Sequence, residues 1–272
     1  MNAGVDLKIE RTMPWALIAA ACLASFAASC SGTTRAPLLL AIAHDLDVSM
    51  PLVANLVSLT SVSWGITSAF GGWMSDRVGR RVLLIVAPLV LAVTMALQAQ
   101  AGTFVSLAAW AVIGGAACGT SMGVLFAEVS AHVVDRQRGR ALGWVMSGQS
   151  FALVLGVPLA AAVGSLIGWR GWFLCVAAFS LASSVALLVT VPKAASRAAG
   201  ARRGTLKGAL SARLWNLLGC GVIERVCYGL AAVYYATFTP GNLQPLARRA
   251  GDPAAGVRRR QCRRHHPGRP VG

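Results

Sequence analysis

Side chains that could carry out chemistry are scarce in this sequence and do not gather into a catalytic or metal-binding pattern. The 272 residues include seven cysteines, four histidines and nine acidic residues. The cysteines have neither a Cys-x-x-Cys spacing nor a histidine partner at metal-ligand distance. No Gly-Lys-Ser/Thr phosphate-binding sequence occurs either. The sequence therefore predicts neither an enzyme nor an ATP-driven pump, and we expect no cofactor and no metal.

Four charged residues lie within or beside apolar stretches, where a charge in the membrane is energetically costly. A charge at the bilayer centre costs about 2.5 to 3.5 kcal/mol on insertion scales. The four candidates are Arg35, Glu128, Glu224 and Arg225. Arg35 could bind an anionic group or extend to the lipid headgroups, and we favour the second. Glu128 is either an interfacial acid or a partner for a nearby loop, whereas Glu224 and Arg225 indicate a polar cavity or a contact between helix bundles.

Seven apolar stretches are long enough to cross a membrane. The chain is 56% hydrophobic and 12% charged, whereas soluble chains have roughly 25% charged residues. Crossing the hydrocarbon core takes about 20 apolar residues. The stretches are residues 14–34, 51–73, 82–101, 104–126, 141–163, 172–191 and 214–238, and the first six contain no Asp, Glu, Lys or Arg. The expected fold class is therefore an all-α, multi-pass membrane protein.

The basic residues are distributed unevenly between the two sides of these stretches. If the N-terminus is cytoplasmic, that side collects 14 of the 25 Lys and Arg residues, and the opposite side keeps only Arg35 and Arg170. This distribution follows the positive-inside rule and predicts a cytoplasmic N-terminus in the cell (inner or plasma) membrane. The net charge of +16 does not indicate nucleic-acid binding, because no basic face with interleaved aromatics is present. We expect His44, Asp45 and Asp47, in the first outer loop, to be solvated.

The loop between the second and third stretches has the most specific pattern in the chain. It consists of a glycine, three residues and then Asp-Arg-x-Gly-Arg-Arg, at Gly72, Asp76, Arg77, Gly79, Arg80 and Arg81. This loop resembles the signature loop of the major facilitator superfamily in both sequence and position. Gly72 would let two helices approach closely, Gly79 would permit a turn, and the arginines would contact the headgroups. The resemblance implies that Asp76 meets the positive end of a helix in the second transporter half and stabilises the outward-open state.

The fifth stretch and the loop before it resemble the drug:proton antiporter branch of that superfamily. Arg138-Gly139-Arg140 is similar to the loop between helices four and five, and Gly148, Gly156 and Pro158 are similar to helix five. The glycines would give this helix one smooth face. Pro158 would remove a backbone hydrogen bond and bend the helix.

The fourth stretch departs from many relatives, which have an arginine where this chain has Ala111. We therefore do not expect proton coupling through that position. Gly115, Gly119 and Gly123 recur every four residues, which predicts one helix face used for close packing.

The sequence predicts four regions. They are a six-helix transmembrane bundle at 1–191, a cytoplasmic linker at 192–213, a seventh transmembrane helix at 214–238 and an irregular Arg/Pro/Gly-rich tail at 239–272. By resemblance, the bundle is the N-terminal half of a major facilitator fold, built as two three-helix repeats. We interpret the tail as the product of a shifted reading frame, with a disordered basic segment on the membrane surface as the alternative.

The resemblance implies a secondary transporter for proton-coupled efflux of a small molecule or drug. Its partners would then be membrane lipid, protons and a small-molecule substrate, and nucleic acid would not be among them. The alternative is a truncated membrane protein without transport activity, because the second transporter half is missing from this chain.

Overall fold

The structure is a computed structural model that describes residues 13–191 together with Ile223 and Cys227. The chain divides into two compact units, Met1–Arg202 and Arg203–Gly272, and almost all described residues belong to the first. The predicted linker and tail lie outside the described residues, as do Glu224 and Arg225. Within the predicted seventh helix only Ile223 and Cys227 are described, and both are helical.

Residues 13–191 are almost entirely helical, and no strand occurs among them. The order of elements is α1 (Trp15–Thr33), the 3-10 helix η1 (Ala36–Leu38), α2 (Leu39–Asp45), α3 (Met50–Val78), α4 (Arg80–Ala99), α5 (Phe104–His132), α6 (Asp135–Phe151), the π-helix η2 (Ala152–Gly156) and α7 (Val157–Thr190). The predicted all-α membrane fold is confirmed.

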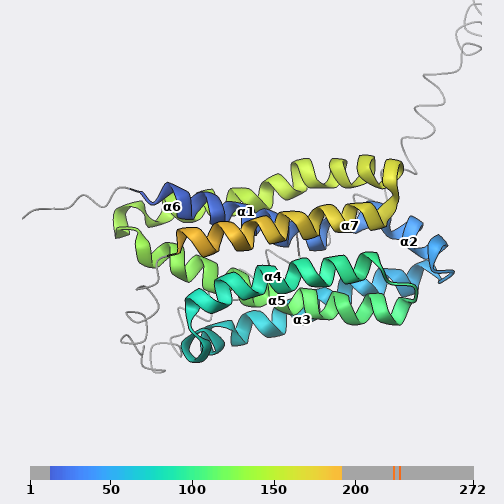
Figure 1. Cartoon of the computed structure of the whole chain (residues 1–272), viewed down its shortest axis with the longest axis horizontal. Coiled ribbons are helices and arrows are strands. Elements are labelled where there is room, and N and C mark those ends of the chain that lie inside the picture. Colours follow the sequence, from blue (N-terminus) through green and yellow to red (C-terminus); the bar gives the residue numbers. More distant parts are fainter. Residues whose placement is uncertain (1–12, 192–222, 224–226, 228–272) are drawn as a thin grey trace, which may run out of the picture. The chain divides into compact units, whose positions relative to one another are not determined.

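These elements make six crossings of membrane length. Five continuous helical stretches are long and apolar enough to span a bilayer, and the last, Asp135–Thr190, has 56 residues. About 20 residues suffice for one crossing. Inside α7, Gly168 adopts φ 78° and ψ 170°, which is not helical, and the chain turns back on itself there (Figure 1). This stretch is therefore long enough for two crossings.

Two helices are longer than the apolar stretches that predicted them. The helices α3 and α5 have 29 residues each, which corresponds to about 44 Å at 1.5 Å per residue. A hydrocarbon core is only about 30 Å thick. Their last turns therefore continue beyond the apolar region into the segments that carry Asp76 and Glu128.

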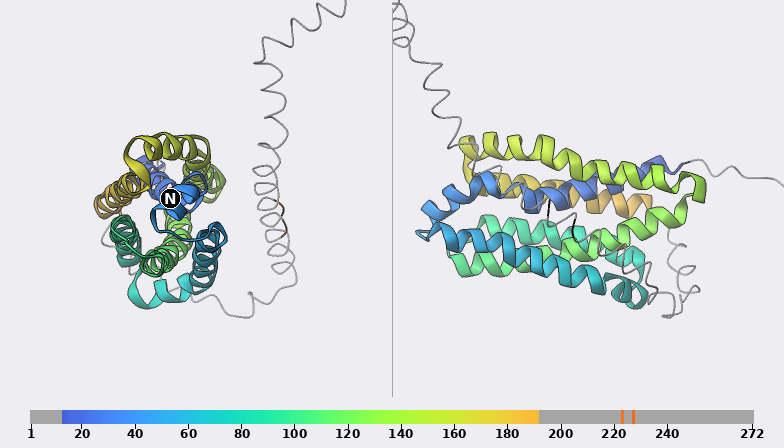
Figure 2. Two further views of the ribbon diagram at one scale, coloured as in Figure 1. Left: turned by 90° about the vertical axis from the view of Figure 1, so that its right-hand side faces the viewer. Right: turned by 180° about the vertical axis from the view of Figure 1, so that it is seen from behind.

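The helices pack side by side along the bundle (Figures 1 and 2). The helix α3 packs mainly on α5, α4 lies between α5 and α7, and α1 packs on α6 and α7. The buried side chains form two clusters, one around Leu38, Leu107 and Trp172 and the other around Leu84, Leu125 and Leu187. The first cluster lies toward the end of the bundle that carries α2, which we call the α2 end. The second lies toward the end where α4 begins, which we call the Arg81 end.

Glycines set the close contacts between helices. A Cβ on Gly115 would lie 2.7 Å from the Thr60 carbonyl oxygen of α3, and a Cβ on Gly119 would collide with Trp64 and Thr67 of the same helix. Gly123 has no such neighbour within 4 Å and is exposed. The prediction of one packing face is thus wrong at Gly123, because no atom of a neighbouring helix among the described residues lies within 4 Å of its Cβ position.

Candidate functional site

The signature loop forms the junction of α3 and α4. Gly79 has φ 95° and ψ 133°, a conformation that residues with a Cβ rarely adopt. Its N–H donates to the Ser75 carbonyl oxygen at 3.0 Å, which closes α3, and Arg80 begins α4. Gly79 therefore makes the turn without an intervening loop.

The three arginines of this loop have different environments. Arg77 is exposed, whereas Arg80 and Arg81 are partly buried. The Nη2 atom of Arg81 donates to the Leu188 carbonyl oxygen at 3.3 Å. Leu188 lies in the last turn of α7, where carbonyl groups lack helical partners and a cation is favourable. Arg81 therefore joins the start of α4 to the end of α7.

The structure does not describe the contacts of Gly72 and Asp76, so the contacts predicted for them are untested. Both residues lie in α3, and the predicted meeting of Asp76 with a helix of a second half stays a prediction. At the neighbouring Gly71, α3 and α5 are in ordinary van der Waals contact. A Cβ on Gly71 would lie 3.6 Å from the Thr120 carbonyl oxygen of α5.

Glu128 is buried near the same end of the bundle, with 3% of its surface exposed. Its Oε1 atom lies 3.5 Å from Nδ1 of His132, one turn along α5. The same Nδ1 atom lies 3.0 Å from the Glu128 backbone oxygen. The interpretation of Glu128 as a simple interfacial acid is wrong, because α5 places its carboxyl group inside the bundle.

The antiporter-like glycines of α6 and η2 pack against α1. A Cβ on Gly148 would collide with the Cys22 carbonyl oxygen, and one on Gly156 would lie 2.9 Å from the Cys30 sulfur. Pro158 follows directly after the π-helix η2 and the first residue of α7. Since its nitrogen cannot donate, the preceding turn lacks an α-helical hydrogen bond, which accounts for the π-helical register there.

Arg35 is buried between helices and does not extend to the headgroups. It is 3% exposed and lies between α1 and η1. Its Nη1 donates to Thr60 Oγ1 of α3 at 3.1 Å, and its Nη2 donates to Gln98 Oε1 of α4 at 3.1 Å. The preference for a snorkelling Arg35 is therefore wrong, because two acceptors lie within the bundle.

Two glycines of α5 bring these acceptors into place. Gly115 allows α3 to approach at Thr60, as described above. A Cβ on Gly114 would lie 3.0 Å from Thr94 Oγ1 and 3.6 Å from Gln98 Nε2, so Gly114 allows α4 to approach in the same way. Thr60 and Gln98 were not among the residues predicted from the sequence. The available signal was weak, namely an uncharged polar residue in each of two apolar stretches.

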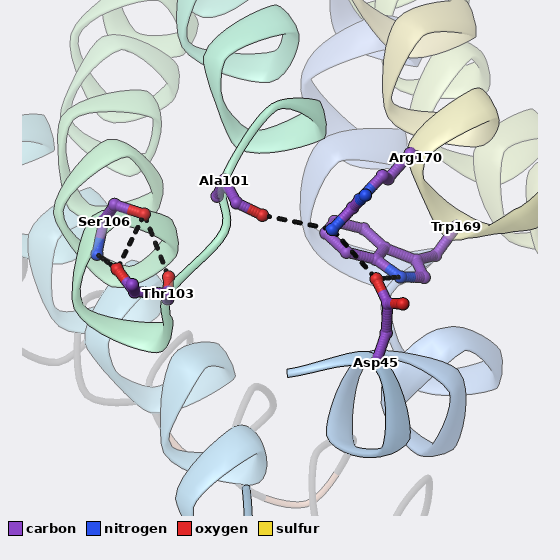
Figure 3. A network of polar contacts seen from close by, with 6 residues as sticks. All are labelled: Asp45, Ala101, Thr103, Ser106, Trp169 and Arg170. Carbon is purple, nitrogen blue, oxygen red and sulfur yellow. Dashed lines mark hydrogen bonds and ion pairs between the residues drawn. The ribbon is translucent and has the colours of Figure 1, made fainter. Parts of the chain in front are cut away.

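A second polar network connects three segments at the α2 end (Figure 3). Arg170 Nη2 lies 3.0 Å from Asp45 Oδ2, and Trp169 Nε1 donates to the same oxygen at 3.2 Å. Arg170 Nη2 also donates to the Ala101 carbonyl oxygen at 3.4 Å. Asp45, predicted to be simply solvated, is about half exposed (45%) and paired. The network ties α2 to the turn of α7 and to the segment between α4 and α5.

An open groove lies beside this network. It has a volume of about 810 Å³ and is lined by residues 37–45 of η1 and α2 and residues 161–170 of α7. Most of its lining is apolar, and its polar groups include Asp45 and Arg170 as well as His44 and Ser165. Among the residues that the structure describes, no three His, Cys, Asp or Glu side chains are placed to hold a metal ion.

Proteins similar to this chain include transporters and a protein named for regulation. The transcription regulatory protein OpdE of Pseudomonas aeruginosa is 30% identical over 197 residues, which are 71% of this chain and 47% of that protein. A chloramphenicol efflux pump of Mycobacterium tuberculosis is 32% identical over 162 residues, which are 58% of this chain and 38% of the pump. The inner membrane transport protein YdhP of Escherichia coli is 30% identical over 195 residues, 68% of this chain and 49% of that protein. The chain thus spans about half the length of the curated relatives it matches.

Solved structures share the fold. The partially occluded inward-open xylose transporter XylE of Escherichia coli superposes with a TM-score of 0.58 at 18% identity, covering 81% of this chain and 60% of that one. The family model of the Major Facilitator Superfamily matches residues 21–247. Since this match covers most of the sequence, the chain is a multi-pass membrane protein that belongs to the Major Facilitator Superfamily.

Proposed function

We propose that this chain supplies the N-terminal half of a secondary transporter that exports a small molecule by alternating access. The observation that carries the proposal is the signature loop at the α3–α4 junction of a six-crossing bundle in a chain of this family. In such transporters the substrate binds near the bilayer midplane between two halves. This bundle would form one wall of that site, and a second six-helix bundle would form the other.

The bundle is consistent with two inverted three-helix repeats. The first three crossings end with α4, and the next three begin with α5. Both positive-φ glycines of the described chain join a second to a third crossing, Gly79 in the first set and Gly168 in the other. These two turns lie at opposite ends of the bundle, as an inverted repeat requires.

We propose that the Arg81 end faces the cytoplasm. Six arginines lie in the segments at that end, namely Arg77, Arg80, Arg81, Arg136, Arg138 and Arg140. At or near the α2 end the described chain has Arg170 and the buried Arg35. By the positive-inside rule, the N-terminus would then lie in the cytoplasm. The protein would lie in the inner or plasma membrane of the cell.

Export of a drug-like compound is supported by the names of two relatives, a chloramphenicol efflux pump and a chloramphenicol resistance protein. We propose the proton gradient as the energy source and Glu128 as a protonatable group. Glu128 is buried and its carboxyl group lies beside the His132 ring. Asp76 would hold one conformation through the end of a helix in the second half.

Accumulation of radiolabelled chloramphenicol in cells that lack their main efflux pumps tests the proposal. Cells that express the chain should retain less drug than cells with an empty vector, and a protonophore should remove the difference. Glu128→Gln and Asp76→Asn should each abolish the difference at equal membrane abundance, whereas Asp47→Asn, a matched change in an exposed residue, should not. Equal accumulation with and without the chain would contradict export and favour the non-transporting alternative.

A further inference from the structure

The buried guanidinium of Arg35 lacks a negative partner within the described chain. Three ion pairs occur among the described residues, and none includes Arg35. Its two acceptors, Thr60 and Gln98, are neutral. A buried cation without a counter-charge is costly in a membrane protein. An anion from outside the described chain would remove this cost.

The unpaired donors show where such an anion would bind. Arg35 Nε and Gln98 Nε2 are both buried without a hydrogen-bond partner in the part of the chain that the structure describes. Arg35 is 3% exposed and Gln98 0%. A buried N–H group left without an acceptor costs about 1 to 3 kcal/mol. Both groups therefore need an acceptor, and both are donors, so neither can satisfy the other.

Thr60 cannot supply the missing acceptor. Its hydroxyl donates within α3 to the carbonyl oxygens of Leu56 and Val57, at 2.9 and 3.0 Å. Its oxygen already accepts from Arg35 Nη1. The side edge of the guanidinium, formed by Nε and Nη2, is the edge that pairs with two-oxygen anions. Gln98 offers one oxygen to Nη2 and leaves Nε open.

We propose that Arg35 and Gln98 form a binding site for a carboxylate-type anion, held by Arg35 Nε–H and Gln98 Nε2–H. The chemistry is shared by a small free anion and by a carboxylate on a larger apolar molecule. This site is separate from the proposed efflux of a neutral drug, and equilibrium binding to it requires no transport.

Thermal unfolding of the purified full chain in detergent, followed by tryptophan fluorescence, tests the site. Sodium formate is the probe for a free anion and sodium benzoate for a carboxylate on an apolar body. Sodium chloride, whose anion has no pair of oxygen atoms to accept from both N–H groups, is the reference at equal ionic strength. At roughly ten times its dissociation constant, a bound anion should raise the unfolding midpoint by about 3 to 6 °C.

The decisive variant is Gln98→Glu, with Gln100→Glu as its matched control. The new carboxylate at position 98 would pair with both Nε and Nη2 and would remove the unpaired amide group. Gln98→Glu should therefore unfold at a higher temperature in sodium chloride and lose the response to formate and benzoate. Gln100 is exposed in the next turn, so Gln100→Glu adds the same charge and should respond as the unchanged chain does.

Two results would overturn the proposal. One is an unchanged chain whose midpoint is the same in all three salts. The other is a Gln98→Glu variant that responds as strongly as Gln100→Glu, which would indicate a general salt effect. If Gln98→Glu is not monodisperse, Arg35→Lys takes its place. It keeps the charge but lacks the two-donor edge, and it should lose the response as well.

Discussion

Replacing Gly148 by alanine should test the packing of α6 on α1. A Cβ at this position would collide with the Cys22 carbonyl oxygen and lie 3.0 Å from the Ser25 Cβ. The first of these atoms belongs to the backbone of α1 and cannot move away without shifting that helix. Overpacking of this kind costs about 1 to 3 kcal/mol. The gain in helix propensity from glycine to alanine is about 1 kcal/mol, so the net change should be a loss of roughly 0 to 2 kcal/mol.

Gly143→Ala in the same helix is the matched control. Gly143 is exposed and has nothing within 4 Å of its Cβ position, so this variant should gain the propensity term alone. The two variants should differ by about 1 to 3 kcal/mol, which corresponds to roughly 2 to 12 °C in the unfolding midpoint. Far-UV circular dichroism of the purified variants in one detergent measures this difference. Equal midpoints would refute the close approach of α6 and α1.

Further predictions concern the turns and the α2 end. Gly79→Ala should lose about 1 to 3 kcal/mol of stability, because alanine is strained at φ 95°, whereas Gly139→Ala should be neutral or stabilising by the same unfolding assay. The Asp45–Arg170 pair should contribute less than about 1 kcal/mol in a double-mutant cycle with Asp45→Asn and Arg170→Gln, because both side chains are about half exposed; a larger coupling would contradict this. Alkaline phosphatase fused at Gly102 should be active outside the cytoplasm, and a fusion at Gly139 should be inactive; the reverse pattern would contradict the orientation.

The sequence was sufficient to predict the fold class. Hydropathy reports the part of each helix that lies in hydrocarbon, so it placed the ends of α3 and α5 several residues too early. The helix α2 was expected as loop because its seven residues are too few to form a separate apolar stretch. The positive φ of Gly168 at the turn of α7 was not predicted from the sequence.

The candidate site was predicted less completely. The sequence identifies Arg35 as a charge beside an apolar stretch. Hydropathy indicates its position along the helix but not which side chains of other helices surround it. Gln98 lies near the end of an apolar stretch, and hydropathy gave no indication that α4 buries it completely. Glu128 illustrates the same limit, since its burial depends on which face of α5 meets other helices.

Flux of chloramphenicol in proteoliposomes that contain the purified chain tests the central claim most directly. An imposed proton gradient should drive uptake into vesicles with the Arg81 end outward, and the rate should fall to that of empty vesicles when the gradient is collapsed. Glu128→Gln vesicles with the same amount of protein should show no gradient-dependent uptake. A rate that equals that of empty vesicles under every gradient would contradict transport by this chain.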